Sequence, residues 1–423
     1  MAVKDITRHP CFNKETAGSC GRVHLPVAPR CNIQCNYCNR KYDCVNESRP
    51  GVTSGVLKPF QAAEYMDKVL AREPRITVAG IAGPGDPFAN PAEVMETMRL
   101  LNERHPHLLF CLSTNGMGIL PYLDDIAALG VSHVTITISA VDPVVGARIY
   151  AWVKDGNVVY RGERGAALLL ERQLAAIRGL KERGIVVKIN SIIIPGVNED
   201  HLPEVARMVA GLGADIQNMI PLKPAQDTPF AGLGEPGPEV VLPLRRAAGG
   251  FINQMTHCKR CRADAVGLLG DDQSGALCGT LQACAKLKSL KEVLARPYVA
   301  VASREGMLVN QHLGEAGAFQ IWGQGEGGYR LVEERQAPPA GCGPQRWADL
   351  AALLGDCRAV LAAAMGETPR MLLEEHGVSP HVVTGLIEDA LRAIYETGDL
   401  KVLKGRRGGI AGGCCTGTGA SCG

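Results

Sequence analysis

The stretch Cys31-Asn-Ile-Gln-Cys35-Asn-Tyr-Cys38 directly follows a short apolar run near the start of the chain. The run predicts a β-strand, so the three cysteines are expected on the loop after the first strand of a sheet. Their CxxxCxxC spacing lets three thiolates converge on one face of that loop and leaves a fourth metal position open. A [4Fe–4S] cluster with one iron that lacks a protein ligand fits this arrangement well. A zinc loop fits poorly because structural zinc sites normally use four ligands in pairs, and buried thiols are the remaining alternative.

Beyond this loop, apolar β-branched runs alternate with helical patterns as far as about residue 222, which is typical of βα units around a parallel sheet. The expected strands are Val23–Ala28, Ile76–Ile81, Leu108–Leu112, His133–Ile138, Val186–Ile194 and Asp215–Ile220. The expected helices include Pro59–Arg72, Pro91–Arg104, Ala166–Arg183 and Leu202–Leu212. Six such units predict a partial (βα)6 barrel, whose active site lies at the carboxyl ends of its strands.

Composition narrows the function classes. The 423 residues are enough for two or three domains, and 45 Lys and Arg against 43 Asp and Glu leave a net charge of +2. Without basic runs or long apolar stretches, neither nucleic acid nor a membrane is an expected partner, and we expect a soluble cytoplasmic protein. In a reducing compartment, 16 cysteines favour metal ligands or redox groups over a disulfide framework.

The rest of the chain divides by composition. Residues 225–243 are rich in Pro and Gly and predict a linker, followed by a helical stretch that ends in the segment 257–264. A short connecting helix is expected at residues 286–295. A second, small α/β domain is expected over residues 297–397, with strands at 298–303, 319–322 and 329–332 and a helix from about Pro380 to Glu396. Residues 404–423 form a Gly- and Cys-rich tail that is too poor in apolar side chains to fold alone.

The cysteine triplet, its place after the first strand and the aromatic Tyr37 together resemble the radical S-adenosylmethionine (SAM) superfamily. The resemblance implies that the open iron binds SAM and that an electron from the cluster cleaves SAM to methionine and a 5′-deoxyadenosyl radical. It also implies SAM contacts at other strand ends, although polar residues there are ordinary turn formers as well. The implied SAM-binding residues are Tyr37, Gly83, Gly85, Asp86, Ser113, Asn115, Ser139, Asn190 and Ile192.

The N-terminal segments His9-Pro-Cys11-Phe and Gly18-Ser-Cys20-Gly-Arg-Val-His24, with the triplet, strongly resemble the NifB family of nitrogenase cofactor biosynthesis proteins. The likeness continues through Asn190-Ser-Ile-Ile-Ile-Pro-Gly and Cys258-Lys-Arg-Cys261-Arg-Ala-Asp264, so it covers essentially the whole barrel. The family builds a large iron–sulfur–carbide cluster from two [4Fe–4S] units. The resemblance therefore implies three [4Fe–4S] clusters, of which one binds SAM and two are precursors.

The same resemblance implies the precursor ligands. Cys11, His24 and Cys111 would hold one cluster, and Cys20, Cys258 and Cys261 the other. A lone strand histidine is more often a core residue, and the Cys258–Cys261 pair is open to a redox or a zinc interpretation, with Cys278 and Cys284 as a second pair at odd spacing. The resemblance places Cys44 and Glu47 beside the fusion site, although Glu47 is equally consistent with a solvated loop carboxylate.

Segments of the second domain, among them residues 300–316, resemble the NifX-like family of cofactor carriers, which implies a ribonuclease-H-like fold. Its best candidate for touching a bound cluster is His312, unless that side chain only caps a turn. Together the resemblances imply residues 1–22 as a cluster-ligand segment, 23–289 as the barrel with its extension, and 297–397 as the carrier domain. The implied partners are cluster donors, cofactor carrier or scaffold proteins and an electron donor such as a ferredoxin.

The leading hypothesis is a radical SAM enzyme that fuses two [4Fe–4S] clusters with one added sulfur and a SAM-derived carbon into an [8Fe–9S–C] precursor of the nitrogenase cofactor. A second hypothesis is a radical SAM enzyme with auxiliary clusters that acts on an organic or peptide substrate. A third is a non-catalytic iron–sulfur scaffold. SAM consumption separates the scaffold from either enzyme, because only an enzyme releases 5′-deoxyadenosine.

Overall fold

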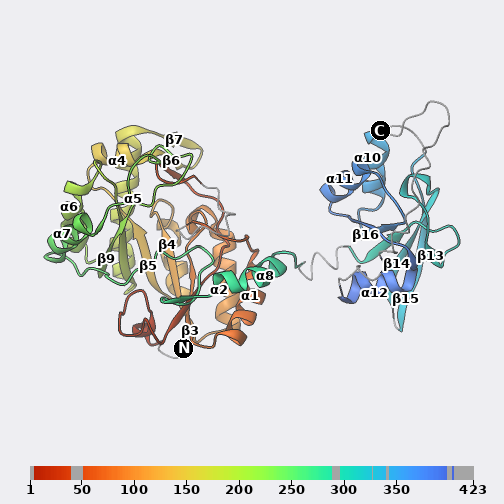
Figure 1. The fold of residues 1–423 in the computed structure, drawn as a ribbon, viewed down its shortest axis with the longest axis horizontal. Coiled ribbons are helices and arrows are strands. Elements are labelled where there is room, and N and C mark those ends of the chain that lie inside the picture. Colours follow the sequence, from red (N-terminus) through yellow and green to blue (C-terminus); the bar gives the residue numbers. More distant parts are fainter. Residues whose placement is uncertain are drawn as a thin grey trace. The chain divides into compact units, whose positions relative to one another are not determined.

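The chain forms two compact units, residues 1–287 and 288–423, each with its own core (Figure 1). The structure, a computed structural model, describes residues 4–39, 51–287, 296–325, 327–339, 343–397 and 403. Cys44 and Glu47, the tail 404–423 and most of the expected connecting helix lie outside these residues. No helix in the described ranges combines the length and the apolar character that crossing a membrane requires.

The first unit is built on an eight-stranded sheet with the order β11-β10-β1-β3-β4-β5-β8-β9. Six strands run parallel: β1 (Gly21–His24), β3 (Ile76–Ile81), β4 (Leu109–Thr114), β5 (Val131–Thr137), β8 (Val186–Ile193) and β9 (Ile216–Pro221). The antiparallel strands β10 (Val266–Leu268) and β11 (Asp271–Asp272) extend the sheet beside β1. The curled sheet of six parallel strands confirms the partial (βα)6 barrel.

Helices connect the parallel strands and bury their apolar faces against the sheet (Figure 1). The connecting helices are α1 (Pro59–Arg72), α2 (Pro91–Arg104), α3 (Leu123–Ala128), α5 (Gly162–Glu182) and α6 (Leu202–Gly211), while α7 (Pro238–Gly249) and α8 (Ser274–Ala285) follow the last parallel strand. Proline at the first turn starts α1, α2 and α7, where its missing N–H costs no helical hydrogen bond. In α1, Ala62, Tyr65, Met66 and Val69 recur at helical spacing and are all buried.

A second, three-stranded sheet was not expected from the sequence. It consists of β2 (Ile33–Cys35), β6 (Tyr150–Asp155) and β7 (Val158–Tyr160), and α4 (Pro143–Ile149) precedes it. Strand β2 lies within the cysteine loop, and Cys35 pairs with Tyr150 in the register of β2 and β6. The small sheet therefore fixes the backbone of the triplet against an excursion of the chain that follows β5.

The second unit contains a five-stranded mixed sheet with the order β15-β14-β12-β16-β17. Its strands are β12 (Tyr298–Val301), β14 (Ala318–Gly325), β15 (Gly328–Gln336), β16 (Cys357–Ala362) and β17 (Ser379–Val382), with a separate pair β13 (Leu308–Val309) and β18 (Gly385–Leu386). The helices are α10 (Pro344–Leu353), α11 (Glu367–Glu375) and α12 (Ile387–Arg392). This mixed sheet with helices agrees with the small α/β domain expected.

Two sequence expectations were wrong in detail. The helix expected from Pro380 to Glu396 begins only at Ile387, because residues 379–382 pair with β16 as the edge strand β17. Proline is tolerated on an edge strand, so Pro380 does not prevent this pairing. The helix expected to end in 257–264 is α7, which starts inside the predicted linker and ends at Gly249.

Candidate active site

The three cysteines of the triplet line one cavity, of about 200 Å³, at the carboxyl ends of the parallel strands. We name it the triplet cavity. It is also lined by Tyr37, Gly85, Asp86, Ser113, Asn115, Asn190 and Ile192, all of which the sequence analysis selected. Gly83 and Ser139, selected with them, are not part of its lining. None of the cysteines that the structure describes is joined in a disulfide.

A close backbone approach attaches the glycine loop after β3 to the cysteine loop. The Gly85 N–H donates to the carbonyl of Ala28 at 2.6 Å, and a Cβ at Gly85 would lie 2.1 Å from the Arg30 carbonyl oxygen. No side chain fits there without moving backbone, so glycine is required by contact rather than by its dihedral angles. The loop therefore lies directly against the segment that leads into Cys31.

Asp86 ties this glycine loop to the end of β4. Its buried carboxylate accepts hydrogen bonds from the Thr114 hydroxyl at 2.9 Å and from the backbone N–H groups of Phe88 and Asn115 at 2.9 and 2.6 Å. Burial raises the pKa of Asp86, and these hydrogen bonds oppose the rise. The Asn115 amide thereby comes within 3.7 Å of the Cys31 sulfur.

Ser139 and Tyr37 support the cavity in different ways. Ser139 is fully buried behind β8, where its hydroxyl accepts a hydrogen bond from the Ile192 N–H at 3.1 Å. It therefore acts on the cavity through Ile192. Tyr37 lies in the wall itself, and burial raises the pKa of its phenol well above the ordinary value, with the neighbouring Cys35 adding to the rise.

Gly83 has a φ of 137°, which the turn before Pro84 requires.

A second cavity, of about 120 Å³, gathers thiols and imidazoles from distant parts of the first unit, and we name it the sheet cavity. Cys11, His24, Cys111, Cys258 and Cys261 all line it, so five of the six residues proposed as precursor ligands come together. The sixth, Cys20, is buried but is not part of this lining. In the described ranges no three acidic, Cys or His side chains converge on a point that a single metal ion could occupy.

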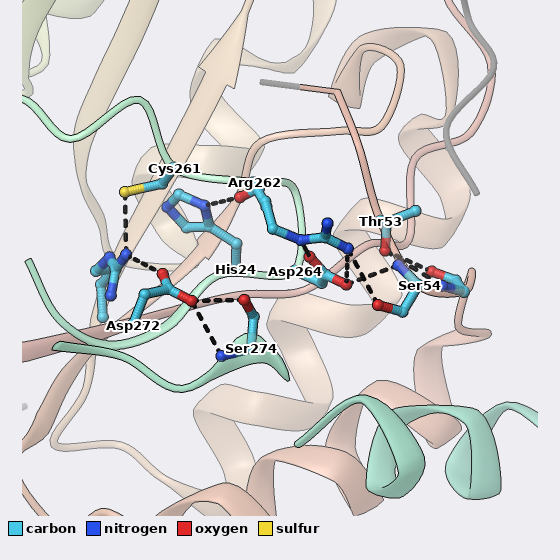
Figure 2. Close-up of polar contacts among 10 residues, drawn as sticks. His24, Thr53, Ser54, Cys261, Arg262, Asp264, Asp272 and Ser274 are labelled. Atoms are coloured by element: carbon cyan, nitrogen blue, oxygen red, sulfur yellow. Dashed lines mark hydrogen bonds and ion pairs between the residues drawn. The ribbon is translucent and has the colours of Figure 1, made fainter. Parts of the chain in front are cut away.

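His24 is held in one tautomer. Its Nδ1 lies 2.9 Å from the Arg262 carbonyl oxygen, as Figure 2 shows. A carbonyl can only accept, so Nδ1 carries the proton and Nε2 presents its lone pair. Desolvation by the surrounding walls lowers the pKa of His24 to about 4, with the Arg22 charge contributing, so the ring is neutral at pH 7. Neutral imidazole with a fixed Nδ1–H is the form that ligates metals.

Three thiols of the sheet cavity, Cys11, Cys111 and Cys261, are protonated when nothing is bound. Burial raises the pKa of Cys111 to about 12 and that of Cys261 to about 11, and it also raises the pKa of Cys11. Thiolate ligation to iron must therefore release protons. At Cys261 the Arg22 guanidinium opposes burial, because one of its nitrogens lies 3.0 Å from the sulfur and 2.6 Å from Asp272.

The segment 262–264 connects His24 to the chain that returns from the triplet loop. The Arg262 side chain forms an ion pair with Asp264 at 2.8 Å and donates to the Ser54 hydroxyl at 3.1 Å (Figure 2). Asp264 also accepts from the Ser54 N–H at 2.7 Å. Residue 54 lies shortly after Cys44 and Glu47, so this contact anchors the end of the segment that carries them.

The two cavities share part of their walls. Ala82, Ser113, Asn190 and Ile220 line both of them. Asn190 and Ser113 occupy the carboxyl halves of β8 and β4, the sheet edge at which a barrel active site is expected. The two cavities are therefore neighbours at this edge of the sheet.

Sequence reasoning missed two cationic side chains of the sheet cavity, Arg22 on β1 and Lys188 on β8. Both are almost fully buried, with 1% and 8% of their surface exposed. The available signal was a charged residue inside an otherwise apolar strand, as in Val186-Val-Lys-Ile.

In the second unit, His312 accepts a hydrogen bond from the Gly314 N–H at 3.0 Å, which is the turn-capping contact.

Comparison with known families agrees with this fold and site. Residues 25–209 match the model of the radical SAM superfamily, and residues 296–397 match the model described as dinitrogenase iron-molybdenum cofactor. The barrel, the triplet loop at its mouth and these matches define a radical SAM enzyme whose second unit matches the dinitrogenase iron-molybdenum cofactor family. Membership of the superfamily implies an iron–sulfur cluster and SAM as cofactors.

Curated relatives show to which family within the radical SAM superfamily the chain belongs. The FeMo cofactor biosynthesis protein NifB of Chlorobaculum tepidum is 51% identical over 401 residues, which cover 94% of both chains. The protein of the same description from Frankia alni is 40% identical over 445 residues, 92% of this chain and 87% of the relative. The chain belongs to the NifB family of FeMo cofactor biosynthesis proteins. Among solved structures, the FeFe-hydrogenase maturase HydG from Carboxydothermus hydrogenoformans matches with a TM-score of 0.42 and 16% identity over 55% of this chain and 52% of its own.

Proposed function

We propose that the protein fuses two [4Fe–4S] clusters, one additional sulfur and one carbon from SAM into an [8Fe–9S–C] precursor of the FeMo cofactor. The observation that carries this proposal is the shared wall between the triplet cavity and the sheet cavity. A SAM-derived carbon has to reach a precursor cluster, and the two cavities are adjacent because both are lined by Ser113 and Asn190.

In this proposal Cys31, Cys35 and Cys38 hold the resident cluster, whose fourth iron binds SAM. When bound there, one SAM would supply a methyl group, and a second SAM, cleaved by an electron from the cluster, would supply a 5′-deoxyadenosyl radical. The chain orients SAM through Tyr37, Gly83, Gly85, Asp86, Ser113, Asn115, Ser139, Asn190 and Ile192. The bare backbone at Gly85 supports this role, because a loop without a side chain allows a ligand to approach closely.

The two precursor clusters are substrates, and the sheet cavity receives them. Cys11, His24 and Cys111 bind one, and Cys20, Cys258 and Cys261 bind the other. Imidazole is a weaker donor to iron than thiolate, so the fixed Nε2 lone pair of His24 suits a cluster that must later be released. Cys20 does not line the cavity in the described structure, so its part requires the segment 12–20 to approach the cavity when the cluster binds.

Cys44 and Glu47 are proposed as a transient ligand and a proton-handling group at the fusion site. The anchoring of Ser54 on Asp264 supports this, because it holds the end of their segment beside the residue that orients His24. The remaining contribution of the chain is to place the reacting groups and to exclude water, which protects a radical from side reactions.

The second unit is proposed to receive or pass on the fused cluster, with His312 as the residue that touches it. The match of residues 296–397 to the dinitrogenase iron-molybdenum cofactor family supports a carrier role. Partners of the whole protein would be a cluster donor, a cofactor carrier or scaffold protein, and an electron donor such as a ferredoxin.

The proposal is tested by counting iron and assaying SAM cleavage in the anaerobically reconstituted chain. Three clusters correspond to about twelve iron atoms per chain. Replacing Cys31, Cys35 and Cys38 together by Ala should leave about eight iron atoms and abolish 5′-deoxyadenosine release. Cys278→Ala is the matched control, because this cysteine of α8 lines neither cavity, and it should change neither quantity.

Two outcomes separate the alternatives. Saturation near four iron atoms removes the fusion hypothesis and leaves a radical SAM enzyme with another substrate. Full loading without SAM cleavage in the unaltered chain identifies a cluster scaffold instead.

A further inference from the structure

The charged side chains that line the sheet cavity are all positive. Arg22, Lys188, Lys259 and Arg260 line it, and none of the described residues in its lining is Asp or Glu. Two of the four cations are neutralised from outside the lining, Arg22 by Asp272 at 2.6 Å and Arg260 by Glu235 at 2.6 Å. The cavity therefore presents an excess of positive charge in a place that is largely shielded from water.

Of the two remaining cations Lys259 is exposed, so Lys188 is the uncompensated charge that is buried. It comes from β8, and with Asn190 it faces the cavity while the alternate residues Val187 and Ile189 are fully buried on the other face. Within the described part of the chain it has no ion-pair or hydrogen-bond partner. Its nearest recorded contact is the Phe12 ring, with the ammonium 4.9 Å from the ring centre. A buried ammonium without an anion is costly, so its position is understandable only if an anion joins it.

Lys188 lines the same cavity as Cys11 and Cys111, two of the proposed ligands. An ammonium in this wall favours the thiolate form of both ligands.

A second unmatched donor belongs to the same cavity. The Cys11 N–H donates to His9 Nδ1 at 3.2 Å, so the proton of this neutral imidazole is on Nε2. That Nε2 atom is buried and has no partner in the described structure. His9 lines the cavity, as do Arg22 and Asn218, which also carry buried unpartnered atoms, Nε and Oδ1. Two of the three unmatched atoms are donors, which again favours an electron-rich occupant.

We propose that Lys188 is a positioning residue that supplies the countercharge for an anionic iron–sulfur cluster with thiolate ligands in the sheet cavity. The inference rests on the proposed function, because it takes the precursor clusters as the occupants. A fixed positive charge beside a cluster stabilises the more negative, reduced state. Lys188 therefore raises the reduction potential of the adjacent precursor cluster and strengthens its retention.

The test uses the full-length chain in which Cys31, Cys35 and Cys38 are Ala, so that only precursor clusters contribute. Lys188→Met removes the charge and keeps the length of the side chain, and Lys188→Arg keeps the charge. Potentiometric titration followed by electron paramagnetic resonance should show that Lys188→Met lowers the ratio of reduced to oxidised cluster about tenfold at a fixed potential. This corresponds to a shift of about 59 mV for a one-electron couple. Lys188→Arg should restore most of the ratio.

Lys181→Met is the matched control, since Lys181 pairs with Asp215 at 2.7 Å and lines neither cavity. It should leave the potential unchanged. The cluster-free protein gives a second readout, in which Lys188→Met should raise resistance to urea, because it removes an uncompensated buried charge. A variant that binds cluster with an unchanged potential overturns the inference, and so does one that is less stable than the parent without cluster. Failure of the parent chain to bind any precursor cluster contradicts the proposed function instead.

Discussion

At the scale of single residues, His24 shows how one backbone contact determines chemistry. The Arg262 carbonyl fixes the proton on Nδ1 and leaves Nε2 free, while the walls keep the ring neutral. If Nε2 binds iron, its nuclear spin couples to the unpaired electrons of a reduced cluster. Pulsed electron paramagnetic resonance should detect a nitrogen coupling in the variant that lacks the triplet cysteines, where the SAM amino group cannot contribute. The coupling should vanish in His24→Ala.

His133→Ala is the control for this measurement, because His133 is a buried imidazole on β5 that does not line the sheet cavity. It should leave the nitrogen coupling intact. A coupling that survives in His24→Ala would show that His24 is a core residue and that another nitrogen binds the cluster.

Functional side chains could be predicted from the sequence only where the spacing of a motif or the resemblance to a family pointed to them. The triplet was found from its spacing, and its cysteines do line one cavity. Lys188 and Arg22 were missed, since a single charged residue in a strand does not show which face of the sheet it occupies or what lies across from it. Their role depends on the contacts of β8 and β1 with segments that are distant in sequence.

At the scale of elements, Arg262 and Asp264 form an ion pair, and both side chains also bond to Ser54. These bonds to Ser54 join the segment after His257 to the one after the triplet loop. Both side chains are buried. Burial raises the pKa of Asp264, but hydrogen bonds from Arg262 and Ser54 outweigh it and the net shift is downward. In the cluster-free protein, Asp264→Asn should lower the free energy of unfolding by about 3 kcal/mol at pH 7, because it removes the carboxylate of a buried ion pair.

The ion pair between Arg262 and Asp264 implies that the free energy of unfolding depends on pH. A carboxyl whose pKa is depressed by folding contributes stability above its unfolded value of about 4, and the contribution disappears as the pH falls through the folded value. The difference between Asp264→Asn and the parent should therefore narrow below about pH 4. Asp155→Asn, which breaks a half-exposed pair with Arg172, should cost less than about 1 kcal/mol. Urea titrations at several pH values measure both, and a difference that stays constant down to pH 2 contradicts the assignment.

Helices and strands were predicted correctly where the local sequence pattern favours the same structure as the pairing of strands in the folded sheet. The six parallel strands were found because apolar runs of this length are buried on both faces, and α1 and α2 match their expected bounds. The small sheet of β2, β6 and β7 was missed, because β2 has only three residues and forms by pairing with a segment more than 100 residues away. Residues 379–382 were misassigned for the same reason, since pairing with β16 overrides the local helical pattern.

At the scale of the whole molecule, the proposed cluster chemistry belongs to the first unit, because every lining residue of both cavities lies between residues 9 and 269. Helix α8 completes this unit, since its Leu277 and Leu281 are buried and Gln61 donates to the carbonyls of Ala285 and Leu287 at 2.9 and 2.8 Å. A chain that ends near Ser289 should therefore still cleave SAM and form the fused cluster.

The control is a chain that ends at Gln273, which lacks α8 and should lose cluster binding because the buried face of α1 becomes exposed. Iron content and 5′-deoxyadenosine release measure both truncations. A chain of 289 residues that folds and loads fully but forms no fused cluster would assign a chemical role to the second unit.

The sheet cavity also has a consequence for the timing of biosynthesis. Cys11 and His24 leave the ribosome early, whereas Cys258 and Cys261 follow about 250 residues later. At 5–20 residues per second this is a delay of roughly 12–50 s. Strand β1 meanwhile has an open edge, because its partner β10 comes from residues 266–268. The cavity cannot close around a cluster before these segments are made, so the proposed site that uses Cys258 and Cys261 can be loaded only after nearly the whole first unit has been synthesised.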